Sequence, residues 1–233
     1  MDALLRRRAM IAAGGSTPPT PLPYTPVEYI VTDGDCYIDT RLYAAPPKAT
    51  EIKVLMGDNV SCALIAGFLV SSGGNAQQFA PARYSSTSKT IAISFYHTYV
   101  GSSDGMPVID YSIDNDKPFI VKTDMKKGAQ NVSVKQENSD SWITVSKSNN
   151  NNVNTTTYNL RIFCAYRNNT NELFAPAGTR LYYCKIWSDE TYTTLIRDFV
   201  PCLYQGEYGL WDKVSDSFFG NAGSGTFSGP SNL

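Results

Sequence analysis

The stretch GLWDKVSDSFFGNAGSGTFSGP, residues 209–230, joins two apolar, strand-like runs to a closing segment rich in glycine. Part of that segment, GSGTFSG at residues 223–229, has the composition of a loop that cradles a phosphate. Such a loop needs a helix after it, or a further strand that carries a lysine. Only four residues follow Gly229 in this sequence. We therefore expect a turn-rich structural segment instead, in which Gly223 and Gly225 adopt positive φ angles.

Short apolar runs bounded by turn residues continue upstream of this segment. In TYNLRIFCAY, residues 157–166, side chains alternate with the two-residue period of a strand. Tyr158, Leu160, Ile162 and Cys164 are expected on one face, and Asn159, Arg161 and Phe163 on the other. We count about fourteen such runs and find no helical periodicity after residue 13. This pattern predicts an all-β protein, either a sandwich or a barrel. Polar loops are expected at residues 71–88, 148–156 and 167–178.

Length and composition fit a single large β-domain. The chain has 233 residues, and all-β domains often run to roughly 200–250 residues. Tyrosine (15) and phenylalanine (10) are frequent, which favours strands. The 20 basic and 21 acidic side chains leave a net charge of −1. Because nucleic-acid binders usually carry a basic surplus, we expect no nucleic-acid partner.

The cysteines and the apolar segments bear on the compartment and on membranes. The five cysteines are scattered without a CxxC pair, which argues against a zinc site and a disulfide framework and favours maturation in a reducing cytoplasm. Cys164 and Cys184 fall in strand-like runs and are expected in the core. No run reaches the roughly 20 apolar residues of a membrane span, and the apolar residues 9–13 are too few for a secretory signal. We expect no membrane partner.

The first 23 residues differ from the rest of the chain. MDALLRRRAMIAA is basic and apolar and is compatible with a short helix, and GGSTPPTPLP, rich in proline, is typical of an extended linker. We therefore divide the chain into an attachment arm with its linker, residues 1–23, and a compact domain, residues 24–233. Burial of the apolar side chains and pairing of the arginines with acidic groups would anchor the arm. The candidate attachment residues are Leu4, Leu5, Arg6, Arg7, Arg8, Met10 and Ile11.

Several segments together resemble one group of domains. They are LPYTPVEYI, CYIDT, KIW, LIRDFVPC and GLWDKVSDSFFGNAGSGTFSGP, in that order, within residues 22–40 and 184–230. They resemble the concanavalin A-like (laminin-G-like) domains of virion proteins from tailed phages that infect gut bacteria. The sequence departs from that pattern at Arg41, where a glycine is usual, and at Ser215-Asp216, where an Asn-Gly turn is usual.

The resemblance implies a fold and a place of action. The fold would be an antiparallel β-sandwich of the jelly-roll type whose two chain ends lie close together. The protein would be a structural virion protein: a head fibre, a decoration protein or a tail-associated protein, assembled in the host bacterial cytoplasm. Its arm would dock on capsid, portal or tail proteins, and its lectin-like domain would adhere to a glycan or the host surface. Fibres commonly form cyclic homo-oligomers, and we favour a trimer.

The resemblance also suggests structural roles for five residues. Gly223, Gly225 and Phe227 would form a clasp that holds the last segment against the sandwich, with Phe227 turned inward. Arg197 and Asp198 would form an ion pair or hydrogen-bond clamp between strands.

Two other classes of function are open to this composition. The first is a carbohydrate-binding module on a bacterial surface. The second is a glycoside hydrolase, which would need paired carboxylates such as ExDxE along a strand. The sequence has no such set, its nearest cluster being Ser188-Asp189-Glu190, and His97 is its only histidine. We expect no catalytic residue and no enzyme.

Ligand sites are weakly marked. Lectin-like domains often bind calcium, and Asp33 with Asp35, or the set Asp114-Asn115-Asp116, would offer the oxygen ligands. Both are ordinary turn sequences, and we otherwise expect no cofactor. Aromatic side chains near loops are available to stack on sugar rings, but the sequence assigns none of them to a site: Tyr84, Tyr96, Tyr99 and Trp142.

Overall fold

The structure, a computed structural model, describes residues 21–42, 48–57, 63–72, 75–85, 90–95, 108–109, 116–126, 129–147, 159–167 and 171–230. These residues form eighteen strands and no helix. The strands are β1 (Thr25–Pro26), β2 (Ile30–Val31), β3 (Ile38–Asp39), β4 (Ala49–Leu55), β5 (Ala63–Ser72), β6 (Asn75–Ser85), β7 (Thr90–Phe95), β8 (Val108–Ile109), β9 (Phe119–Lys126), β10 (Ala129–Gln136), β11 (Ile143–Lys147), β12 (Arg161–Ile162), β13 (Cys164–Arg167), β14 (Asn171–Phe174), β15 (Arg180–Trp187), β16 (Leu195–Tyr204), β17 (Glu207–Asp212) and β18 (Ser217–Phe219).

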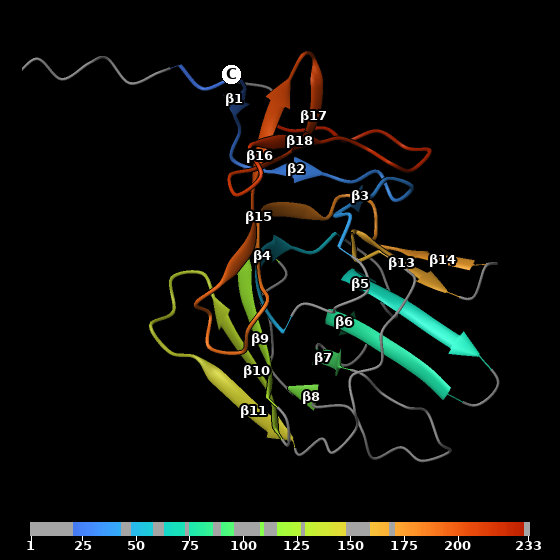
Figure 1. The fold of residues 1–233 in the computed structure, drawn as a ribbon, viewed down its shortest axis with the longest axis vertical. Helices are drawn as coiled ribbons and strands as arrows, with labels where there is room; N and C mark the ends of the chain where they lie inside the picture. The colour runs from blue at the N-terminus through green and yellow to red at the C-terminus, as the bar shows by residue number, and fades with distance from the viewer. Residues whose placement is uncertain are drawn as a thin grey trace, which may run out of the picture.

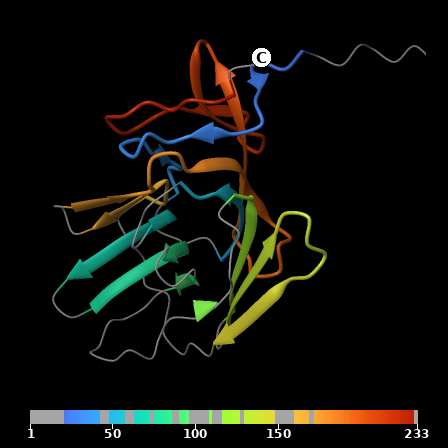
Figure 2. The same ribbon diagram turned by 180° about the vertical axis from the view of Figure 1, so that it is seen from behind.

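The strands form two sheets that pack face to face. The ten-stranded sheet has the order β11-β10-β9-β4-β15-β16-β17-β18, with β1 beside β16 and β2 beside β15. The eight-stranded sheet has the order β14-β13-β5-β6-β7-β8, with β12 paired to β3 and β5. All pairings are antiparallel except a single parallel contact between β13 and β5. Figures 1 and 2 show the two layers from the front and from behind. The prediction of an all-β sandwich is confirmed.

Alternation along the strands of the larger sheet separates the core from the solvent. In β4, Ile52 and Val54 are buried, whereas Glu51 and Lys53, which alternate with them along the strand, are only partly buried. Strands β9 and β10 repeat this pattern. The predicted core cysteines Cys164 and Cys184 are both buried. The core that lies between the sheets contains, among others, Ile30, Ile38, Phe119, Val121, Val132, Leu160, Phe163, Leu181 and Phe199.

The first and last described segments lie side by side at one end of the molecule. Thr25 in β1 pairs with Leu203 in β16, and Val31 forms a β-bridge with Ser228. In Figure 1 this end is at the top, near the chain terminus, while β8 and β11 lie at the opposite end. No helix within the described ranges is long and apolar enough to cross a membrane.

One expected loop is in fact a strand. We predicted a polar loop over residues 71–88, but β6 occupies eleven of these residues and pairs with both β5 and β7. Pro81 lacks a backbone donor, and the pairing register shifts between Ala80 and Arg83 around it. This bulge lets the strand continue in the sheet, but it also breaks the two-residue alternation by which a strand is predicted from sequence. β14 likewise lies inside the loop predicted at residues 167–178.

Candidate functional site

The closing segment packs against the turn at residues 32–36. The backbone amides of Ser224 and Gly225 both donate to the carbonyl of Asp35, and the amide of Thr226 donates to Asp33 Oδ2 at 2.6 Å. The Asn221 side chain ties the segment internally, accepting from the amide of Gly223 and donating to the carbonyl of Gly225. The chain end is therefore held by hydrogen bonds to residues almost two hundred positions earlier.

Gly223 and Gly225 allow the closing segment to pack closely on the turn at residues 32–36, and the prediction that they adopt positive φ angles is wrong. Gly223 and Gly225 are not among the residues with positive φ. Instead, a Cβ at Gly223 would lie 2.3 Å from the carbonyl oxygen of Asp35, and one at Gly225 would lie 2.1 Å from Asp33 Oδ1. Positive φ occurs, among other residues, at Arg41 (57°) and Asp216 (51°), the two places where the sequence departs from the pattern it resembles. The guanidinium of Arg41 lies 5.0 Å from the ring centroid of Phe219.

Phe227 is buried at 4% exposure and its ring packs on Phe163 at 5.5 Å between centroids. The clasp residues Gly223, Gly225 and Phe227 are thus together, whereas Arg197 and Asp198 lie apart from them on β16.

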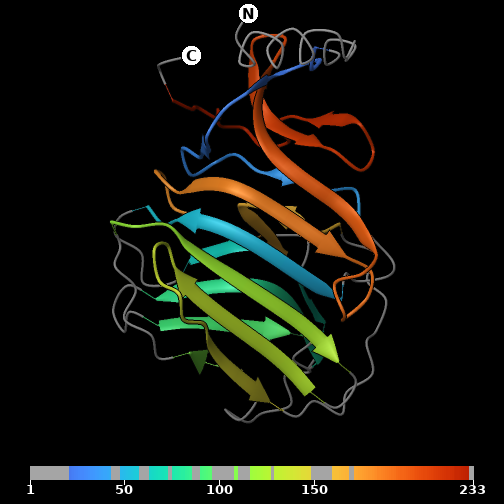
Figure 3. The same cartoon turned by 90° about the vertical axis from the view of Figure 1, so that its left-hand side faces the viewer.

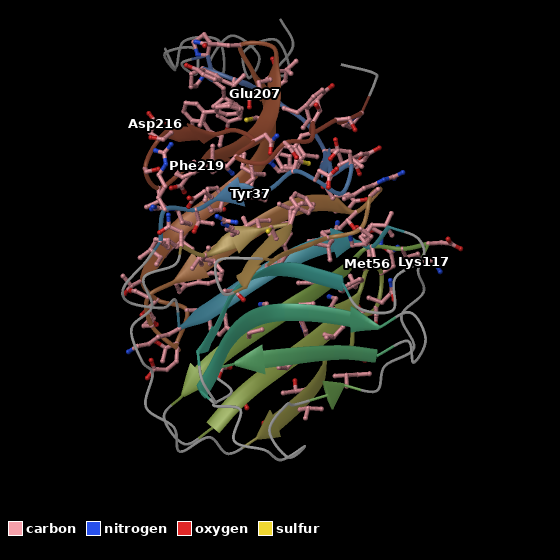
Figure 4. The ribbon with its side chains drawn as sticks, turned by 90° about the vertical axis from the view of Figure 1, so that its right-hand side faces the viewer. Tyr37, Met56, Lys117, Glu207, Asp216 and Phe219 are labelled. Carbon is pink, nitrogen blue, oxygen red and sulfur yellow. The ribbon has the colours of Figure 1, made fainter. Side chains whose placement is uncertain are left out.

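Figure 4 labels Phe219, Asp216 and Glu207 in the upper part of the molecule and Tyr37 below them. Glu207 accepts the amide of Asn221.

Arg197 contacts a carboxylate on the neighbouring strand β17, but this partner is Asp212 and not Asp198. The Arg197 guanidinium lies 3.6 Å from Asp212 Oδ2 and donates to the carbonyl of Thr40. Asp212 is completely buried and also accepts the amides of Asp198 and Val214. Asp198 Oδ1 is buried and has no hydrogen-bond partner within the described part of the chain. Nothing in the sequence distinguished Asp212 from the other turn aspartates.

The proposed calcium ligands are partly used for other contacts. Asp33 Oδ1 accepts the amide of Asp35 and Asp33 Oδ2 accepts that of Thr226. These hydrogen bonds, that from Asp35 first, hold the pKa of Asp33 below its usual value. In the residues the structure describes, no three His, Cys, Asp or Glu side chains are grouped to hold a metal ion. Asp114 and Asn115 lie outside the described residues, so calcium stays a prediction.

The outer face of the larger sheet carries a second concentration of functional groups. Figure 3 shows this face toward the viewer, with the smaller sheet behind it. Because the strands pair in register, outward side chains form rows across the sheet. One row consists of Tyr183, Lys53, Ile120 and Lys135, and the next of Lys185, Glu51, Lys122, Ser133 and Thr144.

Trp142 lies over these rows from the start of β11. It is 38% exposed, an unusual exposure for so large an apolar side chain. The ammonium groups of Lys122 and Lys135 lie 5.0 and 5.8 Å from its ring centroid, which is cation–π distance. The indole therefore packs on the lysines of β9 and β10 rather than on the core. We call Trp142, Lys122 and Lys135 the indole platform.

A partly buried carboxylate positions one lysine of the platform. Glu51 Oε2 lies 2.8 Å from Lys122 Nζ, and Glu51 Oε1 accepts the hydroxyl of Tyr183 at 2.7 Å. Burial, followed by this hydrogen bond, raises the pKa of Tyr183, so that the phenol stays protonated and donating at neutral pH. Lys53 is paired with Glu137. Lys135 and Lys185 have no ion pair with a described carboxylate.

The loop between β15 and β16 borders the platform. Asp189 accepts the amides of Thr191, Thr193 and Thr194, which organises the loop as an Asx turn. The loop thereby holds Tyr192, whose ring packs edge-on against Trp187 at 5.0 Å and whose hydroxyl donates to the carbonyl of Thr123. Lys122 lies 5.9 Å from the Tyr192 ring centroid. Asp189 belongs to Ser188-Asp189-Glu190, the cluster that comes nearest to a catalytic carboxylate set in the sequence. In the structure Asp189 forms a turn.

Most of the remaining residues that the sequence singled out lie outside the part of the chain that the structure describes. All seven attachment residues of the arm, together with His97, Tyr96 and Tyr99, lie outside the described residues, and Tyr84 is described only as part of strand β6. Of the aromatic residues considered for sugar stacking, Trp142 is the one with a described side chain. The sequence did not reveal its neighbours Lys122 and Lys135, because strand pairing alone brings them to it.

Comparison with protein-family models and with curated proteins gives no match for this sequence. Among solved structures, the chain is similar to a protein from Bacteroides ovatus ATCC 8483 that has been proposed to bind carbohydrate. The TM-score is 0.55 at 9% identity, over 88% of this chain and 61% of that one. This likeness shows a shared fold.

Two phage structures are also similar. The enzymatically active domain of tailspike protein 2 from bacteriophage CBA120 aligns with a TM-score of 0.46 and 13% identity, over 70% of this chain and 28% of that one. The full-length tailspike protein 2 aligns with a TM-score of 0.46 and 10% identity, over 79% of this chain and 31% of that one. The chain therefore spans less than two thirds of the length of each of these three proteins.

Proposed function

We propose that this protein is a structural virion protein of a tailed phage that displays a glycan-binding β-sandwich. The sandwich fold is also that of the Bacteroides ovatus protein proposed to bind carbohydrate. The motifs at both ends of the chain resemble virion domains of this class, and the finer identity, a concanavalin A-like jelly roll in a head fibre or decoration protein, rests on that resemblance. The observation that carries the binding role is the indole platform on an open sheet face.

The layout of the described chain supports display from a particle. The chain begins at the end of the molecule that holds β1 and β17, and it also returns there, since the Tyr208 hydroxyl donates to the carbonyl of Pro230. An anchor that precedes residue 21 would leave the β8–β11 end and the sheet face pointing outward. In this proposal the apolar and arginine side chains of residues 1–13 dock on capsid, portal or tail proteins, and three copies assemble through their arms.

Deletion of residues 1–13 tests the anchoring role. We expect the shortened protein to keep its fold, measured by thermal unfolding, but to be missing from purified virions, measured by quantitative mass spectrometry. The full-length chain, expressed at the same level during infection, is the control. Incorporation of the shortened protein at the level of the full chain contradicts the anchor, and absence of both from virions contradicts the virion role itself.

A carbohydrate-binding module on a bacterial surface is the second candidate, because it would use the same platform. The two candidates differ in where the protein is found, and the virion measurement separates them. We propose a non-enzymatic role in either case. Among the described residues, the carboxylates nearest the platform are already engaged, Glu51 by Tyr183 and Lys122 and Asp124 by Asn131.

A further inference from the structure

We infer that the indole platform binds acidic sugars, that is, carbohydrate residues that carry a carboxylate. The inference rests on the proposed glycan-binding role and narrows it to one ligand chemistry. The geometry would place the apolar face of a sugar ring on Trp142 and its carboxylate on the ammonium group of Lys135, with Lys122 beside it.

The aromatic part of the platform suits a sugar ring. Sugar rings present a face of C–H groups that packs on an aromatic ring, and tryptophan is enriched at binding interfaces because it combines a large apolar ring with a polar N–H. Trp142 remains 38% exposed even with two lysines against it. Around it the sheet offers hydroxyl and amide groups from neighbouring strands: Ser133 with Thr144 at 2.8 Å, and Ser146 with Asn131 at 2.5 Å.

The charges beside the indole favour an anion. Lys122 is held in place by Glu51, so its own charge is largely balanced. Lys135 has no described carboxylate within ion-pair distance, and neither does Lys185, three strands away in the next row. The whole chain has a net charge of −1, so this positive surplus is local to the face. A ligand carboxylate would supply the missing counter-charge through charge-assisted hydrogen bonds.

The same face is poorly suited to two other classes of partner. A stable protein interface needs about 800 Å² on each partner with an apolar centre. Among the described side chains of this face, the exposed large apolar one is Trp142, set among charged and hydroxyl side chains. Ile143 is in register with the buried Val134 and therefore points to the opposite face. A nucleic acid would require a continuous basic stripe, whereas Glu51, Glu137 and Asp124 interrupt the lysines of this face.

The test compares matched acidic and neutral polysaccharides on the full-length chain. Polygalacturonate, alginate and hyaluronate are immobilised, each beside its carboxyl-reduced counterpart, which has the same backbone without the charge. Binding is measured by biolayer interferometry at low and at physiological salt. We expect at least one acidic polymer to bind about ten-fold or more tightly than its reduced form, and added salt to weaken that binding.

Four variants locate the binding on the sheet face. We expect Trp142→Ala to abolish binding, Trp142→Phe to retain part of it, and Lys135→Gln to weaken it about five-fold. Lys213→Gln is the matched control, since Lys213 is exposed on the turn between β17 and β18 at the other end of the molecule. Its affinity should equal that of the unaltered chain.

Each contrary result has a separate meaning. Equal binding to the acidic and reduced polymers overturns the acidic preference and leaves the glycan-binding role standing. Equal weakening by Lys135→Gln and Lys213→Gln shows unspecific charge attraction and overturns the site. Absence of binding to every polymer overturns the inference and the glycan role together. If, in that case, Trp142→Ala also changes the oligomeric mass, the face is an interface between copies of the chain.

Discussion

At the scale of single residues, close approach rather than backbone conformation explains the glycines of the closing segment. Gly223 packs on the backbone of Asp35 and Cys36, and Gly225 packs on the carboxylate of Asp33. A backbone atom cannot move aside without displacing the whole turn, whereas a carboxylate can rotate at the expense of its hydrogen bonds. The two positions should therefore differ in their tolerance of a methyl group.

We predict that Gly223→Ala lowers the free energy of unfolding by about 3 kcal/mol and Gly225→Ala by about 1.5 kcal/mol. The larger loss reflects the collision with the carbonyl of Asp35, and the smaller one reflects displacement of the Asp33 side chain. Urea unfolding provides the measurement. Ser224→Ala, in the same segment and exposed, should stay within about 0.5 kcal/mol of the unaltered protein. Equal stability of all three variants would show that the segment is not a clasp.

The carboxylate of Asp33 should make the clasp sensitive to acid. Its pKa is lowered in the folded protein, first by the amide of Asp35 and then by that of Thr226. A lowered pKa contributes stability above the unfolded value, near 4, and this contribution disappears as the pH falls toward the folded value. We predict that Asp33→Asn flattens the loss of stability below about pH 4 in urea unfolding. Asp35→Asn removes a carboxylate from the same turn without breaking these bonds. If it flattens the curve equally, the assignment to Asp33 fails.

At the scale of elements, the first described residues are fixed on the antiparallel hairpins β16–β17–β18. Tyr24, immediately before β1, stacks on Trp211 in β17 with 4.8 Å between ring centroids. The Trp211 indole nitrogen donates to Asp216, which fixes the ring's orientation. A small hydrophobic cluster of Tyr24, Cys202 and Trp211, separate from the main core, thus secures β1 to β16.

We predict that Tyr24→Ala destabilises the protein by about 3 kcal/mol, because it removes a buried ring from this cluster. Thermal unfolding is the measurement. Tyr24→Phe keeps the stacking and should behave like the unaltered chain. Leu22→Ala changes a side chain that is 58% exposed and serves as a second control. A loss in Tyr24→Ala no larger than that in Leu22→Ala would mean that the chain start contributes nothing to the sandwich.

At the scale of the whole molecule, the two ends of the described chain meet. Val31 and Ser228 exchange two backbone hydrogen bonds, at 2.8 and 3.1 Å. These bonds tie the closing segment to β2 at the other end of the described chain. In our proposal, attachment and assembly fall to the arm.

We predict that a chain of residues 24–233 folds alone and is a monomer, whereas the full-length chain is a trimer. The reason is that the apolar side chains proposed for assembly lie in the arm, while the described sandwich is closed by its own ends. Circular dichroism should show a β-spectrum with little helix for residues 24–233, and light scattering at micromolar concentration gives the masses. A trimer of the shortened chain would place the assembly surface on the sandwich. A monomeric full-length chain would contradict self-assembly in solution.

The sequence by itself determined the fold class. Alternation with a two-residue period, seen at Leu160, Ile162 and Cys164, predicts strands with one buried face, and these three side chains are buried. Phe163 between them is also buried, because its positive φ of 69° interrupts the alternation. Sequence patterns failed where a strand is polar or interrupted. β6 contains Pro81 and the polar stretch Asn75–Gln78, so it shows no apolar alternation although it pairs with the neighbouring strands β5 and β7. β2 and β3 are too short to show a period.

Tertiary structure alone decided the candidate site. Tyr183 and Glu51 are 132 residues apart in the chain and 2.7 Å apart in space. Trp142 meets Lys122 only because β9, β10 and β11 pair in one register, and a shift by one residue would turn these side chains into the core. Similarly, Arg197 in β16 pairs with Asp212 in the neighbouring strand β17 rather than with Asp198, which follows it in the sequence. Local periodicity encodes which face of a strand is buried, but the identity of the neighbours on the other face depends on strand order, which long-range packing sets.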